Sequence, residues 1–175
     1  MDNKYNREKS ILDNKGWVII KKMFSNVEIE EFRTLAKMDE SVNTLHSDIL
    51  TNPKLGFLVY EKRIINVLNI LLSGDITYFG DGRLLIESVN GRKGGAFHRD
   101  NSDRYNSDGP DWNSNYDVIR IGLYLEDHKN FSEGLGFFNS SNKCQKNIPN
   151  KFVIVENAPI EPGDLLIWKL TTIHV

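Results

Sequence analysis

The stretch PGDLLIWKLTTIH, residues 162–174, decides the fold that we predict for this chain. It begins with a Pro-Gly-Asp turn and continues as an apolar run in which Leu166, Trp168 and Leu170 would share one face of a strand. The run ends at His174, one residue before the chain stops, without a turn or a polar tail. Because such a strand would normally continue into a turn and a partner strand, we expect the chain to be truncated just after His174.

Shorter segments before this stretch have the same character. From about residue 76 onward, apolar runs alternate with clusters of Gly, Asn, Asp and Pro, which is typical of an all-β core. These predicted strands lie at 84–89, 118–125, 135–138, 152–155 and 165–170.

The first part of the chain predicts one strand and two helices. Residues 16–24 are rich in β-branched and aromatic residues and predict a strand. Ser25 and Glu28 have the spacing of a capping box, which places a helix near 26–40. A second helical pattern runs from Asn52 or Pro53 to Leu72.

These elements predict a mainly β fold with N-terminal helices, because helices followed by a series of short strands do not form alternating βαβ units. We expect a β-sandwich or barrel buttressed by two helices in a single domain, 1–175. Its helical part would span about 16–73 and its β core about 76–175.

Composition excludes several classes of protein. The chain has 175 residues with 22 Lys and Arg against 24 Asp and Glu, a net charge of −2, which argues against nucleic-acid binding. Its single cysteine, Cys144, can form neither an internal disulfide nor a cysteine-based zinc site, so a reducing, cytoplasmic setting is expected. No apolar run approaches the roughly 20 residues of a membrane helix, and the polar N-terminus has no signal-peptide pattern.

Two of the four histidines begin an H-x-D tripeptide. His46 lies between two predicted helices, where His46-Ser47-Asp48 indicates a turn or a helix cap. His98 and Asp100 instead follow a Gly-rich segment at the expected edge of a strand, where residues two apart face the same side and can bind one metal ion.

A metal site at this strand edge needs a third ligand. Two imidazoles and one carboxylate on one face of an octahedron are the ligands of non-haem Fe(II) oxygenases. His174 is the favoured third ligand because it ends a strand that can return to the same edge. His128 is the rival, although its turn-like surroundings favour a solvated loop position.

A long polar segment, 99–117, interrupts the predicted strands. It is either a solvated surface loop or a lid over a pocket, and the large rings of Tyr105, Trp112 and Tyr116 are the reason to consider the lid. Tyr105 and Trp112 are therefore candidate substrate-binding residues.

Three blocks of the sequence resemble the phytanoyl-CoA dioxygenase-like proteins. Residues 120–143, RIGLYLEDHKNFSEGLGFFNSSNK, are similar to that family's strand, turn and strand after the H-x-D motif. Residues 162–174 resemble its distal-histidine strand, and residues 16–32, GWVIIKKMFSNVEIEEF, resemble its opening strand and helix. The resemblance covers most of the chain, from Gly16 to His174.

The resemblance implies a double-stranded β-helix, or jelly roll, that lacks its last strand and binds Fe(II) through His98, Asp100 and His174. It implies an enzyme that hydroxylates a small organic substrate while converting 2-oxoglutarate and O2 to succinate and CO2. Related halogenases replace the metal-binding carboxylate with a small residue, so Asp100 favours hydroxylation.

The family's usual 2-oxoglutarate anchor is an Arg downstream of the distal histidine, and this chain ends before that position. Strand alternation puts Arg120 and Tyr124 on one face, where Arg120 either binds a carboxylate of the cosubstrate or substrate, or pairs with an acid in solvent. Arg83 is a weaker candidate. Two alternatives to the oxygenase remain: a catalytically degenerate jelly-roll binding module, and a cupin-like metal enzyme that does not use 2-oxoglutarate.

Overall fold

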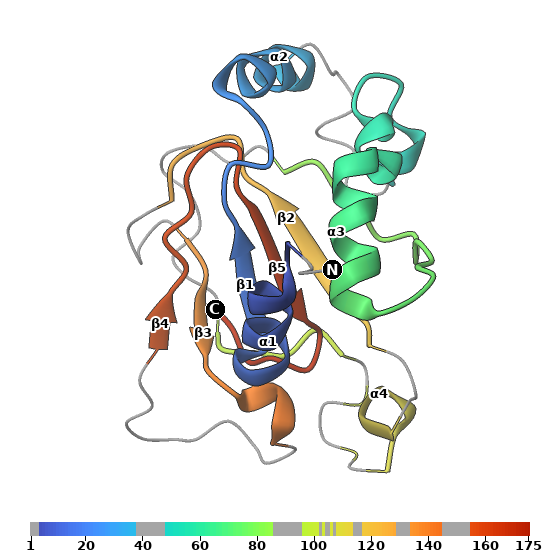
Figure 1. The fold of residues 1–175 in the computed structure, drawn as a ribbon, viewed down its shortest axis with the longest axis vertical. Coiled ribbons are helices and arrows are strands. Elements are labelled where there is room, and N and C mark those ends of the chain that lie inside the picture. Colours follow the sequence, from blue (N-terminus) through green and yellow to red (C-terminus); the bar gives the residue numbers. More distant parts are fainter. Residues whose placement is uncertain are drawn as a thin grey trace.

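The structure is a computed structural model that describes residues 4–37, 48–85, 96–101, 103, 106, 108–113, 117–128, 134–144 and 155–175. Its helices and strands are α1 (Asn6–Lys15), β1 (Trp17–Ile20), α2 (Asn26–Lys37), α3 (Lys62–Leu72), α4 (Pro110–Asn113), β2 (Ile119–Leu123), β3 (Gly136–Phe138), β4 (Val155–Asn157) and β5 (Leu165–Lys169) (Figure 1). Short 3-10 helices span Ile49–Thr51, Gly56–Tyr60 and Ser141–Lys143.

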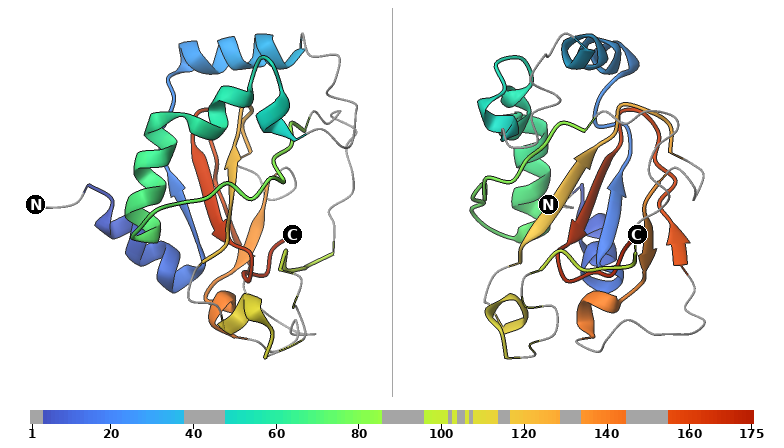
Figure 2. Two further views of the ribbon diagram at one scale, coloured as in Figure 1. Left: turned by 90° about the vertical axis from the view of Figure 1, so that its right-hand side faces the viewer. Right: turned by 180° about the vertical axis from the view of Figure 1, so that it is seen from behind.

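Strand β5 is the centre of a three-stranded antiparallel sheet with the order β1-β5-β2. Trp168 of β5 is paired with Trp17 of β1 on one side and with Arg120 of β2 on the other. A second antiparallel sheet joins β3 and β4. Figure 2 shows the larger sheet between helices α1 and α3 on one side and β3 on the other, so this part of the molecule has three layers.

The central strand is apolar from Leu165 to Trp168, where both of its faces are buried, and it ends in Lys169. Leu165 and Ile167 face the helices and join a core that includes Leu12 of α1, Phe32 of α2 and Leu68 of α3. Leu166 and Trp168 face the other way and pack with the residues Trp17, Phe137, Ala158 and Ile160. The face that carries Trp168 is the one that positions the site described below.

Several sequence predictions are confirmed. The capping box forms, since the Glu28 carboxylate accepts hydrogen bonds from the backbone N–H and the hydroxyl of Ser25, both at 2.8 Å. The predicted strands at 16–24, 118–125, 135–138 and 165–170 contain β1, β2, β3 and β5. Only residue 155 of the predicted strand 152–155 is described, and it begins β4; residues 86–89 of the strand predicted at 84–89 lie outside the described residues.

The predicted continuous helix from residue 52 or 53 to 72 is wrong in its first part. The Asn52 side chain accepts hydrogen bonds from the N–H groups of Lys54 and Leu55, at 2.9 and 2.8 Å, and so forms a turn that competes with the helix. Glu61 then accepts from the N–H of Arg63 and caps α3, which begins at residue 62. Helix α1 was not predicted at all.

Candidate metal centre

His98 and His174 lie opposite each other on two antiparallel segments. Each donates its backbone N–H to the carbonyl oxygen of the other at 2.9 Å. Side chains of such a pair project to the same face, and the centres of the two imidazole rings are 4.4 Å apart. On its other side, the His174 segment pairs with the segment around Phe137, so His174 lies between two neighbours.

Asp100 completes the cluster from the same face as His98. One carboxylate oxygen, Oδ1, is 3.5 Å from Nε2 of His98, and the other, Oδ2, is 3.6 Å from Nε2 of His174. One ligand atom from each of the three residues lies within 4.8 Å of the other two. Of the residues that the structure describes, these three form the cluster suited to a metal ion.

Both imidazoles are held with Nε2 free for a metal. Nδ1 of His98 lies 3.0 Å from the carbonyl oxygen of Ala96, and Nδ1 of His174 lies 3.0 Å from that of Thr172. A carbonyl only accepts, so each Nδ1 must carry the proton and donate. A backbone carbonyl in this position fixes the tautomer and the ring orientation of a metal-binding histidine.

The three side chains differ in their exposure to solvent. The His174 side chain is 4% exposed, that of Asp100 is 14% exposed and that of His98 is 42% exposed. Burial lowers the pKa of His174 below its usual value, although the Thr172 carbonyl and the Asp100 carboxylate oppose this shift. The neutral imidazole, which is the form that binds a metal, is thereby favoured, and the His98 side leaves the centre open to solvent.

Two further side chains contact the Asp100 carboxylate. The indole N–H of Trp168 donates to Oδ2 at 3.2 Å, and Nε of Arg120 lies 2.9 Å from the same oxygen. The Arg120 contact is an ion pair, because its Nε–H does not have a hydrogen-bonding direction toward the oxygen. Trp168 belongs to the core, and its buried indole N–H needs an acceptor, which the Asp100 carboxylate supplies.

Of the two arrangements that the sequence left open for Arg120, the structure shows pairing with acids, Asp81 and Asp100, and the binding of a cosubstrate or substrate carboxylate stays a prediction. Its Nη2 donates to Asp81 at 2.9 Å, and its side chain is 39% exposed. The segment around Asp81 is fixed by Asp48, which accepts hydrogen bonds from the Tyr78 hydroxyl and from the N–H of Gly82. The guanidinium thus lies beside the cluster and joins its carboxylate, Asp100, to an acid on a neighbouring segment, Asp81.

Tyr124 and His128 form a separate contact, with ring centres 5.0 Å apart. Burial raises the pKa of Tyr124 to about 12, so its hydroxyl stays protonated. The backbone of His128 is paired with Ile160. The structure brings His174 rather than the rival His128 together with His98 and Asp100.

Trp112 lies away from the cluster. Its ring covers the guanidinium of Arg99 at 5.3 Å, and its indole N–H donates to the carbonyl oxygen of Asp103 at 2.8 Å. Its role in substrate binding stays a prediction. Tyr105, Tyr116 and His46 lie outside the described residues.

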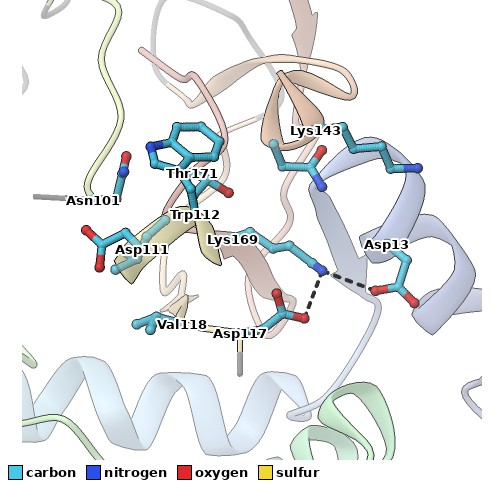
Figure 3. A pocket seen from close by; sticks show the side chains of 11 residues that line it. Asp13, Asn101, Asp111, Trp112, Asp117, Val118, Lys143, Lys169 and Thr171 are labelled. Atoms are coloured by element: carbon cyan, nitrogen blue, oxygen red, sulfur yellow. Dashed lines mark hydrogen bonds and ion pairs between the residues drawn. The ribbon is translucent and has the colours of Figure 1, made fainter. Parts of the chain in front are cut away.

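A pocket of about 430 Å³, which Trp112 helps to line, is not lined by His98, Asp100 or His174. Lys169 reaches into this pocket and forms ion pairs with Asp13 and Asp117, at 3.2 and 2.9 Å (Figure 3). Lys169 follows Trp168 in β5 and projects to the opposite face, toward α1. Lys169 and Asp13 thus line the pocket on the α1 side of the sheet, whereas Trp168 contacts Asp100 on the other side.

Compared with known protein families and with curated proteins, the sequence matches none. Its fold is nevertheless similar to that of several solved enzymes. SnoK, a non-heme α-ketoglutarate-dependent carbocyclase from nogalamycin biosynthesis, has a TM-score of 0.72 and 14% identity over 99% of this chain and 77% of its own.

Two metal complexes are also similar in fold. HygX from Streptomyces hygroscopicus, solved with nickel and 2-oxoglutarate bound, has a TM-score of 0.67 and 15% identity over 97% of this chain and 79% of its own. The nickel complex of the non-heme monooxygenase ThoJ has a TM-score of 0.71 and 13% identity over 95% of this chain and 68% of its own. Within the described residues, no helix has the length and apolar character to cross a membrane.

Proposed function

We propose that this protein is an Fe(II)/2-oxoglutarate-dependent oxygenase that hydroxylates a small organic substrate. The observation that carries the proposal is the cluster of His98, Asp100 and His174, in which both imidazoles present Nε2 to one carboxylate. This donor set is the facial triad of non-haem Fe(II) oxygenases, and it leaves three coordination positions for other ligands. The similarity of the fold to α-ketoglutarate-dependent enzymes supports the same class.

The residues present fit an iron ion. Two neutral imidazoles and one carboxylate are intermediate in softness and suit Fe(II). Asp100 is oriented by Trp168, and each histidine by a backbone carbonyl, so the ligands are held before a metal arrives. The two facing sheets, with the cluster on the segments that join them, support the assignment of a double-stranded β-helix.

Bound iron with 2-oxoglutarate would supply the O2 activation that replaces a substrate C–H by C–OH, with release of succinate and CO2. The chain's own residues would bind and orient the metal and the cosubstrate. His98, Asp100 and His174 would hold the metal, and Arg120 would bind a carboxylate of 2-oxoglutarate next to it. Arg120 suits this role because a guanidinium binds a carboxylate through two parallel hydrogen bonds. Tyr124, on the same strand face, is the second candidate cosubstrate-binding residue.

The substrate would reach the cluster from the side of the exposed His98 ring. Tyr105 and Trp112 remain the proposed substrate-binding residues, on the segment between the H-x-D motif and β2. A small molecule is proposed as the partner because the net charge of −2 gives no basis for binding a polyanion.

One alternative has an observation of its own. Arg120 is already engaged by Asp81 and Asp100, which would favour a metal enzyme of similar fold that does not use 2-oxoglutarate. An assay of 2-oxoglutarate turnover distinguishes this alternative from the proposed oxygenase. The protein is loaded anaerobically with Fe(II), exposed to O2 with 2-oxoglutarate and assayed for succinate, with His174→Ala as the control. Succinate that requires Fe(II) and His174 supports the proposal, and iron-loaded wild-type protein that forms none overturns it.

A further inference from the structure

Arg99 lies between two members of the cluster, but its side chain leaves the site. Neighbouring residues of an extended segment project to opposite sides, so His98 and Asp100 face the cluster while Arg99 turns away from it. Arg99 is nevertheless 3% exposed. Burying a guanidinium costs free energy unless its N–H groups are hydrogen-bonded. The groups to which Arg99 donates therefore indicate its structural role.

Among the described residues, Arg99 donates to backbone carbonyl oxygens on two other segments. Its Nε donates to Thr171 at 2.9 Å, and its Nη2 donates to Cys144 at 2.7 Å and, more weakly, to Ser141 at 3.4 Å. The ring of Trp112 covers the guanidinium from another side. The donors are fixed in one plane, which lets one side chain join separate pieces of backbone rigidly.

These two segments hold the third member of the cluster. Thr171 lies three residues before His174, in the turn that leads from β5 to the histidine. The hydroxyl of Ser141 accepts a hydrogen bond from the N–H of Ile173 at 2.9 Å and donates to the carbonyl of Phe138 at 2.7 Å. Arg99 therefore links the segment that carries His98 and Asp100 to both supports of His174.

We propose that Arg99 is a positioning residue of the metal centre. It sets the spacing between the His98-x-Asp100 segment and His174, and through that spacing it determines metal affinity and coordination geometry. The inference rests on the proposed function, because it assumes that these three residues bind a metal. The distances within the cluster depend on the register and separation of two backbone segments, one with His98 and Asp100 and the other with His174. Arg99 contacts the turn at Thr171, which leads into the His174 segment.

The test measures metal binding apart from turnover. Purified Arg99→Met and Arg99→Lys are titrated with Co(II), whose visible absorption reports both affinity and coordination geometry, and their thermal unfolding is recorded. Arg33→Met is the matched control, because Arg33 also uses Nε and Nη2 to bind a backbone carbonyl, that of Leu125 beyond the end of β2. His98→Ala defines loss of the site.

We expect Arg99→Met to weaken Co(II) binding by about 10-fold or more and to change the absorption spectrum, as residues that orient metal ligands do. Arg33→Met should keep the wild-type affinity and spectrum even where it lowers the unfolding temperature as much. Arg99→Lys, which keeps the charge without the planar donors, should be impaired as well; it decides the matter if Arg99→Met does not fold.

Folded Arg99 variants that bind Co(II) with wild-type affinity and spectrum would overturn the inference while leaving the proposed function intact. Failure of the wild-type protein to bind Co(II) would overturn both. The two failures are therefore distinguishable in one set of titrations.

Discussion

The backbones of His98 and His174 form a reciprocal pair, in which each N–H donates to the other residue's carbonyl oxygen at 2.9 Å. This register places both imidazoles on one face. A slip of one residue would turn one of the rings to the opposite face and separate it from Asp100. The cluster is thus a consequence of strand pairing, and its integrity depends on the few hydrogen bonds that fix the register.

The first prediction concerns which histidine completes the site. His174→Ala should weaken Ni(II) binding by about 100-fold or more, because it removes a ligand rather than a residue that orients one. His128→Ala is the matched control, since its backbone is paired with Ile160 outside the cluster, and it should bind within about twofold of wild type. Calorimetric titration measures both. Equal losses in the two variants would contradict the assignment of His174.

The second prediction concerns Arg120. In metal-loaded protein, Arg120→Met should weaken 2-oxoglutarate binding by about 10- to 100-fold, as expected for the loss of hydrogen bonds to a charged group. Arg83→Met is the control, because Arg83 pairs with Asp81 from a more exposed position, at 3.3 Å. Tryptophan fluorescence during a 2-oxoglutarate titration measures the affinity. Unchanged binding in Arg120→Met would remove Arg120 as the cosubstrate anchor.

The sequence predicts the cluster of His98, Asp100 and His174 better than it predicts the residues around that cluster. The H-x-D spacing identifies His98 and Asp100, because strand periodicity determines which side chains share a face, and the position of His174 at the end of an apolar strand favours it over His128 as the third member. The contacts of Trp168, Arg120 and Arg99 are not predictable in this way. They depend on which segments the fold brings together, and residues 68 positions apart, Asp100 and Trp168, have no local signal of their contact.

In the helical part, too, the sequence predicts features that have a local signal and misses those that depend on tertiary contacts. Helix α2 is predicted by its capping box and apolar period, whereas α1 was missed because its apolar residues are two adjacent ones, Ile11 and Leu12, which give no helical period. The helix predicted from residue 52 or 53 was too long, because the spacing of apolar residues gives no information about the Asn52 turn or the Glu61 cap. At Gly56 a Cβ would lie 2.6 Å from the carbonyl oxygen of Leu50, a close approach that only tertiary structure reveals.

The third prediction concerns the turn before β5. Asp164 is fully buried and accepts hydrogen bonds from the N–H groups of Lys22 and Glu161, both at 2.9 Å, and from the ammonium of Lys21 at 2.7 Å. Asp164→Ala should lower the free energy of unfolding by about 2–3 kcal/mol, because it removes a buried charged acceptor from three partly buried hydrogen bonds. Urea denaturation measures the loss.

Glu161→Gln is the control for Asp164→Ala. Its carboxylate lies 3.8 Å from the ammonium of Lys21 in an ion pair whose two side chains are 43% and 49% exposed. Such a surface pair contributes about 0–1 kcal/mol. If both variants lose the same stability, the Asp164 network does not hold the turn.

The fourth prediction concerns the capping box and pH. Hydrogen bonds from Arg63 and from Ser25 lower the pKa of Glu28 from 4.5 to about 2. Its folded-state pKa is depressed, so its stabilising contribution is present above about pH 4.5 and is lost as the pH falls toward 2. Glu28→Gln should therefore destabilise the protein at pH 7 and have a smaller effect near pH 2.

The expected loss for Glu28→Gln at pH 7 is about 1 kcal/mol, a value typical of a helix cap, because the side chain is 31% exposed and its ion pair with Arg63 is screened. Thermal unfolding of both proteins at several pH values measures the difference. A destabilisation that is constant from pH 7 to pH 2 would show that the Glu28 charge is not involved.

The most direct test of the central claim is an anaerobic titration of the purified protein with Fe(II) and then with 2-oxoglutarate, followed by the metal-to-ligand charge-transfer absorbance. We expect a visible band that requires both additions and is absent from His98→Ala. A folded wild-type protein that binds Fe(II) but forms no band with 2-oxoglutarate would contradict the claim that this centre uses that cosubstrate. A folded wild-type protein that binds no Fe(II) would contradict the metal centre itself.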